Sequence, residues 1–124
     1  MSTTAVLLEC VHGQLSHASL AAIQAAQTRN TPFDVFLMGH DIQALCQNIA
    51  SYVGIEHVHY TDDASCVEPL PEVYSGWAIP HLKSYSSILM GMNAWGKATL
   101  PRIAAQLQCQ QYSDVIAWCG QHGL

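Results

Sequence analysis

Charge is scarce in this sequence. Asp, Glu, Lys and Arg make up 10% of its 124 residues, against roughly 25% in an ordinary globular protein. The formal net charge is −5, and the four basic side chains are Arg29, Lys83, Lys97 and Arg102. Because nucleic-acid binding depends on many cations that neutralise phosphates, this class of function is excluded. So few charges also indicate that part of the surface lies against another domain or subunit.

Two other features are missing. The five cysteines include no C-x-x-C pair, and an odd number cannot all pair with one another. Free cysteines inside or beside apolar runs are typical of a reducing cytosol. No stretch approaches the roughly 18–20 consecutive apolar residues of a membrane span, and residues 1–4 show neither signal-peptide nor transit-peptide features. We therefore expect a bacterial cytoplasmic protein that does not insert into a membrane.

The chain alternates short apolar runs with helical patterns. Its length fits a single domain over residues 1–124. Apolar strands separated by helices predict an α/β fold, in which a parallel sheet is covered on both faces. Right-handed crossovers favour a three-layer doubly wound (Rossmann-like) sheet of about five strands in the order 3-2-1-4-5. The predicted strands are residues 5–10, 33–38, 56–60, 87–92 and 114–119.

Capping residues predict the ends of the first two helices. Ser16 is a good N-cap for a helix that ends near Thr28. Asp41 is expected to cap the second helix, and Gly54 supplies the left-handed stop after it.

Prolines mark the other two helices. The third helix is expected over residues 71–83, with a kink near Gly76 and Pro80 because both residues disfavour a helix interior. Pro101 is tolerable only in the first turn, so the fourth helix is expected over residues 99–108.

Ligands of a doubly wound sheet bind beyond the carboxyl ends of the first and fourth strands. The loop after the first strand, residues 10–14, contains a single glycine. A dinucleotide fold needs several glycines there, so that the backbone can approach the pyrophosphate. A self-contained NAD site is therefore excluded.

The loop after the fourth strand carries a G-x-x-x-x-G-K pattern over residues 91–97. This pattern between a strand and a helix is typical of a phosphate-binding loop, but Ala98 replaces the magnesium-binding Ser or Thr, and Trp95 would crowd the phosphates. A glycine turn that directs Lys97 toward solvent or a partner is the simpler interpretation. The alternative is a stand-alone adenine-nucleotide-binding domain. The candidate phosphate or partner contacts are Asn93, Gly96, Lys97 and Arg102.

Seven histidines raise the question of a metal. His57 and His59 alternate along one predicted strand and therefore point to the same face. A metal site needs a third ligand and supporting carboxylates. Glu56 is expected on the opposite face, and Asp62 and Asp63 lie in the loop beyond, so we expect no metal site. The sequence also has no G-x-S-x-G elbow and no recognisable Cys–base pair, so we expect no catalytic residues and no enzyme.

Three segments together resemble one known family. They are residues 5–16 (AVLLECVHGQLS), 95–107 (WGKATLPRIAAQL) and 112–117 (YSDVIA). The second segment follows a G-K-x-x-L-P-R-[VI]-A-A-x-L pattern, and the third follows S-D-[IV]-I-A. The segments keep their order along essentially the whole chain and resemble the amino-terminal domain of the α subunit of electron transfer flavoproteins.

The resemblance implies a heterodimer of α and β subunits that holds one FAD. Such a carrier passes electrons from dehydrogenases, such as those acting on acyl-CoA, to a membrane quinone reductase or another acceptor. The family's amino-terminal α domain is a scaffold packed on the β subunit, while FAD is held mainly by the carboxy-terminal α domain. We expect that flavin domain to be absent here, so no flavin-contacting residue is transferred. The expected protein is a colourless fragment or short form that binds the β subunit or self-associates.

Overall fold

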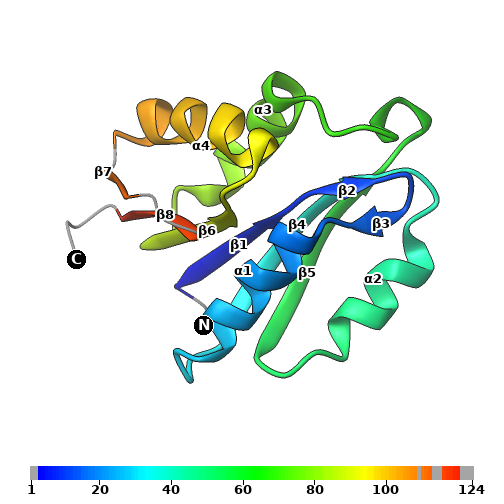
Figure 1. The fold of residues 1–124 in the computed structure, drawn as a ribbon, viewed down its shortest axis with the longest axis horizontal. Helices are drawn as coiled ribbons and strands as arrows, with labels where there is room; N and C mark the ends of the chain where they lie inside the picture. Colours follow the sequence, from blue (N-terminus) through cyan, green and yellow to red (C-terminus); the bar gives the residue numbers. More distant parts are fainter. Residues whose placement is uncertain (1–2, 109, 113–115, 121–124) are drawn as a thin grey trace.

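The computed structural model describes residues 3–108, 110–112 and 116–120. Its main sheet has the strand order β5-β4-β1-β6-β8-β7 (Figure 1). The predicted order 3-2-1-4-5 is confirmed in the first five of these strands. The strands that run parallel are β1 (Thr4–Leu8), β4 (Phe33–Gly39), β5 (Ile55–Asp62) and β6 (Ser87–Gly91).

The direction of the fifth predicted strand is wrong. β8 (Ile116–Gly120) pairs with β6 in the antiparallel direction, and β7 (Gln110–Tyr112) pairs antiparallel with β8 outside it. The chain therefore reaches the sheet from the last helix as β7, parallel to β6, and β8 turns back between the two. A strand of only three residues has too short a pattern to be recognised from sequence. Residues 114 and 115 of the predicted strand lie outside the described residues.

The helices that cover the sheet are α1 (His17–Gln27), α2 (Gln43–Ala50), α3 (Pro71–Leu82) and α4 (Ala94–Leu107). The first two pack on one face and the last two on the other, which makes three layers (Figure 1). Along β1, Ala5 and Leu7 face α3 and α4, whereas Val6 and Leu8 face α1 and α2. The doubly wound, Rossmann-like class is confirmed. Within the described part of the chain, no helix combines the length and apolar content needed to cross a bilayer.

Two predicted capping positions are confirmed. Ser16 is the N-cap of α1, and its hydroxyl accepts the Ser19 N–H at 3.1 Å. Gly54 has a left-handed φ of +92° in the turn after α2. Pro71 is the first residue of α3, as the pattern predicts. The kink expected within α3 stays a prediction.

The predicted cap of α2 is wrong. Asp41 has a φ of +54° and does not cap the helix with its side chain. The carboxylate of Asp62, at the end of β5, instead accepts the N–H groups of Asp41 and Ile42 at 2.8 Å and 3.1 Å. A residue distant in sequence thus supplies the acceptor for the N–H of the N-cap residue, Ile42, and for the N–H of the residue before it.

The predicted start of α4 is also wrong. The helix begins at Ala94, not near Thr99, because Asn93 caps it by accepting the Gly96 N–H at 3.0 Å. Pro101 consequently lies inside the helix. It removes one backbone hydrogen bond there, on the exposed side of α4.

Candidate functional site

The crevice between β1 and β6 is the place where the strand order reverses, and doubly wound sheets bind ligands at such a point. Side chains of the protein itself occupy it. Glu9, directly after β1, accepts a hydrogen bond from the Asn93 side-chain amide at 2.7 Å. The backbone N–H of Glu9 donates to the Ser19 hydroxyl at 2.7 Å. The loops after β1 and β6 and the start of α1 are thereby tied together.

Two glycines bring backbone segments into contact at the same crevice. A Cβ atom on Gly91 would lie 2.4 Å from the carbonyl oxygen of Ala18 in α1. One on Gly96 would lie 2.1 Å from the carbonyl oxygen of Gly91. Neither position has room for a side chain, so the glycines of the G-x-x-x-x-G-K pattern serve the close packing of β6, α1 and α4.

Residues 94–97 of the G-x-x-x-x-G-K pattern lie in α4, so the prediction that the whole pattern forms a loop is wrong. Only two residues separate β6 from α4. The Asn93 side chain takes the Gly96 N–H, which belongs to the group of donors that a phosphate at a helix start would use. Trp95 is buried and donates its indole N–H to the Pro69 carbonyl at 2.8 Å.

The structure brings two of the four candidate contacts together and places the others apart. Asn93 and Gly96 meet at the start of α4. Lys97 is exposed on the first turn of α4. Arg102 lines a groove of about 470 Å³ between α3 and α4. Their assignment as phosphate or partner contacts stays a prediction.

The residues of the β1–β6 crevice do not fit a dinucleotide such as FAD. Glu9 places a carboxylate where a pyrophosphate would approach, and the two negative charges would repel each other. Asn93 already occupies a donor at the helix start. The polar groups of Glu9, Asn93 and Ser19 at this crevice hydrogen-bond to other groups of the protein.

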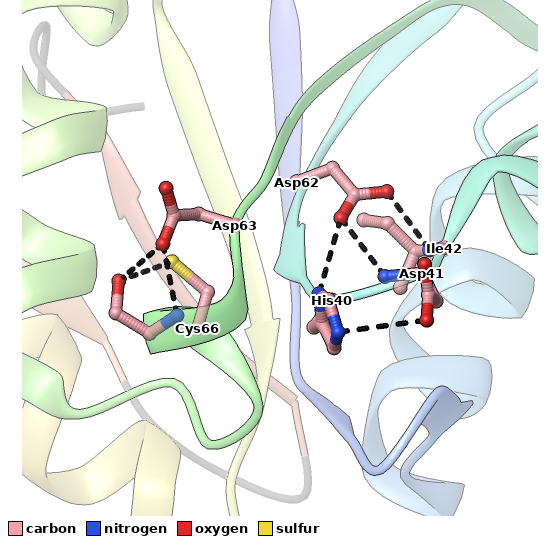
Figure 2. Close-up of polar contacts among 7 residues, drawn as sticks. His40, Asp41, Ile42, Asp62, Asp63 and Cys66 are labelled. Carbon is pink, nitrogen blue, oxygen red and sulfur yellow. Dashed lines mark hydrogen bonds and ion pairs between the residues drawn. The ribbon is translucent and has the colours of Figure 1, made fainter.

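The loops after β4 and β5 form a second polar cluster (Figure 2). Asp62, besides capping α2, has its Oδ1 3.8 Å from His40 Nδ1, and His40 Nε2 lies 3.5 Å from an oxygen of Asp41. Asp63 accepts the backbone N–H of Ser65 at 2.9 Å and its hydroxyl at 2.8 Å. These two hydrogen bonds lower the pKa of the Asp63 carboxyl. The acidic side chains of this cluster hold the two loops in place.

A small hairpin lies next to these loops. β2 (Cys10–Val11) pairs antiparallel with β3 (Gln14–Leu15) and replaces the end of the predicted first strand. The hairpin turn residues His12 and Gly13 line a hollow of about 320 Å³ together with His40 of the β4 loop. The lining offers imidazole groups and no permanent positive charge.

A third cluster lies at the other end of β4 and β5. The predicted common face of His57 and His59 is confirmed: His57 Nδ1 lies 3.2 Å from Oδ1 of Asp34, and His59 Nε2 lies 3.5 Å from Oδ2. The predicted opposite orientation of Glu56 is wrong, since its Oε1 lies 3.8 Å from His57 Nδ1. Sequence reasoning missed Asp34, although one acid inside the apolar run 33–38 is a visible signal.

Comparisons with known proteins point to one family. The family model described as "Electron transfer flavoprotein domain" matches residues 4–120. The chain is 30% identical over 113 residues to the probable electron transfer flavoprotein subunit alpha, mitochondrial, of Schizosaccharomyces pombe, covering 89% of this chain and 33% of that protein.

Two further relatives agree with this match. The electron transfer flavoprotein subunit alpha of Pseudomonas aeruginosa is 29% identical over 111 residues, covering 90% of this chain and 36% of the relative. A probable mitochondrial subunit alpha of Caenorhabditis elegans is 26% identical over 117 residues, covering 93% and 35%. The chain spans about a third of the length of these curated relatives.

Proposed function

Because the chain belongs to the electron transfer flavoprotein domain family, we propose that it is the scaffold domain of an α-type subunit in an FAD-dependent electron carrier. The carrier passes electrons from dehydrogenases, such as those acting on acyl-CoA, to a respiratory acceptor. The observation that carries the proposal is the family match over residues 4–120, together with relatives named as subunit alpha.

In this proposal the domain of residues 1–124 catalyses no reaction. FAD is held mainly by the carboxy-terminal domain of the α subunit, and the present domain packs against the β subunit. The filled β1–β6 crevice supports this division, because Glu9 and Asn93 occupy the place of a pyrophosphate. We assign the protein to the bacterial cytoplasm; the Pseudomonas relative supports this, whereas the Schizosaccharomyces relative is named as mitochondrial.

The outer face of α3 and α4 is the surface that we propose for the β subunit. Val73 on α3 is 48% exposed, and Leu70 just before the helix is 51% exposed. The adjoining groove is lined by Ile79, Pro80 and Arg102, among others. Since α3 also buries apolar residues against the sheet, it carries apolar side chains on its inner and its outer side. This is typical of a helix that is packed against protein on both of these sides.

Association with the β subunit tests the proposal. The purified chain is mixed with the electron transfer flavoprotein β subunit of the same source cell, and chromatography with light scattering measures the mass. We expect a one-to-one complex. The Val73→Asp substitution should weaken it about tenfold or more, because the charge would lose its water at the interface.

Val53→Asp is the matched control, since Val53 is 79% exposed after α2, away from α3. It should leave the complex unchanged. Absence of any complex with the unmodified chain would refute the scaffold role, and equal losses in both variants would refute the proposed face.

An absorption spectrum and a thermal melt test the division of functions. We expect the purified chain to be colourless, and stoichiometric yellow flavin would contradict the proposal. A ligand that binds only the folded state raises its apparent stability. In this proposal ATP and AMP do not bind to the chain, so they should leave the melting temperature unchanged. A rise that Lys97→Ala abolishes would favour the stand-alone nucleotide-binding alternative.

A further inference from the structure

The cluster around Asp34 combines burial with several polar neighbours. Asp34 lies within the apolar run 33–38 of β4, and its side chain is only 7% exposed. The Tyr85 hydroxyl donates to Oδ2 at 2.5 Å. Each imidazole contacts a different oxygen of the carboxylate: His57 contacts Oδ1, and His59 contacts Oδ2. A carboxylate at such depth is stable only with hydrogen bonds, an opposite charge or a metal.

An irregularity in β5 brings a second carboxylate to this cluster. Phe33 of β4 pairs with Ile55, but the next residue, Asp34, pairs with His57. Glu56 is therefore an inserted residue, and such a β-bulge redirects side chains that would otherwise alternate between the two faces. This is why Glu56 Oε1 lies 3.8 Å from His57 Nδ1 on the cluster side.

We propose that Asp34, Glu56 and His57 bind a Zn²⁺ ion. One ligand atom of each residue lies within 4.8 Å of the other two. In a tetrahedral zinc site with bonds of about 2.0–2.1 Å, neighbouring ligand atoms are about 3.3 Å apart. The separations of 3.2 Å from Asp34 Oδ1 to His57 Nδ1 and 3.8 Å from that nitrogen to Glu56 Oε1 are near this spacing. The ion takes the place of the proton between His57 and Asp34.

Tyr85 and His59 act as positioning residues for this site. Both contact Oδ2 of Asp34, whereas Oδ1 is the oxygen that lies 3.2 Å from His57 Nδ1. Hydrogen bonds to the outer oxygen of a ligating carboxylate are typical of metal sites. The His59 ring is itself stacked on Phe36 with 4.7 Å between centroids. The site is thus held from inside the protein and open to solvent at His57, whose side chain is 64% exposed.

The donor set favours Zn²⁺ over Mg²⁺ and Ca²⁺. The imidazole nitrogen of His57 is a ligand that suits zinc, which also binds carboxylate oxygens, and three protein ligands leave a fourth position for water. The two harder cations prefer oxygen ligands and higher coordination numbers. Because the ligands come from β4 and β5, the bound ion also joins the edge strand to the sheet, and zinc should raise the melting temperature.

Titration calorimetry of the chain with ZnCl₂ tests the proposal, near neutral pH and with a phosphine reductant. We expect one ion per chain and no binding of MgCl₂. The substitutions His57→Ala and Glu56→Ala should each weaken zinc binding by about tenfold or more. Both residues are exposed, so these variants should keep the fold. Asp34→Asn should also lose the site, and circular dichroism checks its fold before titration.

His40→Ala is the matched control. His40 also holds an imidazole near two carboxylates, 3.5 Å from Asp41 and 3.8 Å from Asp62. Its substitution should change zinc affinity by less than about twofold, and zinc should shift the NMR ring signals of His57 but not those of His40. Failure of the unmodified chain to bind zinc overturns the proposal, as does binding that survives both His57→Ala and Glu56→Ala. Equal binding of Mg²⁺ overturns the zinc assignment.

Discussion

The β1–β6 crevice and the β4–β5 edge use their polar groups in opposite ways. At the crevice, Glu9 and Asn93 bond to each other, and the backbone of Ala18 packs against Gly91 without space for a side chain there. At the edge, Asp34 is buried, while the imidazole of His57 that faces it is 64% exposed. The first region is the usual ligand position of this fold, yet the second is the one open to a small ion.

This difference shows that the usual ligand position of a fold is not by itself evidence of a ligand site. The polar groups of the crevice are turned toward one another, so they stabilise the packing of β1, β6 and α1. Those of the edge are turned toward one another and toward solvent. Function has to be argued from the groups present and their accessibility, and the fold alone supports only an analogy.

Tyr74 joins the two regions and should show the largest effect. Its hydroxyl accepts the Leu8 N–H of β1 at 3.2 Å and donates to the Phe36 carbonyl of β4 at 2.8 Å. Tyr74→Phe keeps the packing but removes a partner from two buried backbone groups. We expect the free energy of unfolding to fall by about 2–4 kcal/mol. Urea denaturation measures this, and a loss within experimental error would show that the two strands do not depend on the hydroxyl.

Closure of the crevice predicts the next largest effect. The methyl group in Gly91→Ala meets backbone atoms of Ala18, so the unfolding free energy should fall by about 1–3 kcal/mol.

Gly76→Ala in α3 is the control for this substitution. Its new Cβ meets nothing within 4 Å. Alanine favours a helix over glycine, so stability should rise by about 0.5–1 kcal/mol. Equal effects of the two substitutions on the thermal midpoint would contradict a tightly closed crevice.

The cap of α2 predicts a smaller change near the open edge. Asp62→Ala removes the acceptor of two N–H groups and should lower the unfolding free energy by about 1 kcal/mol. Asp41→Gly should leave stability unchanged or raise it slightly, because residue 41 has a φ of +54°. If Asp41→Gly were the more destabilising variant, the capping role of Asp62 would be wrong.

The smallest expected effect is a change in pH dependence. Burial raises the pKa of the Cys46 thiol from 9.0 to about 11, with smaller contributions from the Asp62 carboxylate and the Cys10 thiol. Above pH 9 the unfolded chain releases this proton while the folded protein keeps it, so stability should fall between pH 9 and about 11. Denaturation midpoints measured across this range should fall less steeply in Cys46→Ala. Parallel profiles would show that Cys46 is not the group responsible.

Much of the fold could be predicted from local patterns. The apolar run before Gly39 predicts a strand, and Ser16 predicts the start of a helix. Both signals depend only on residues near in sequence, and the structure has β4 and α1 at these places. The preference of Pro101 for a first turn predicts the wrong start of α4, because the Asn93 cap begins the helix at Ala94. The bulge at Glu56 could not be predicted, because it exists only in the register between β4 and β5.

The sequence by itself determined the α/β class, the strand order and the family resemblance, because these depend on which residues are apolar and at what spacing. Only the tertiary structure decided the reversed direction of β8, the closed crevice and the Asp34 cluster. The Asp34–His57 contact joins residues 23 positions apart and the Glu9–Asn93 contact residues 84 apart. No periodic pattern records such pairs, since their geometry depends on how strands register and helices dock after the chain has folded.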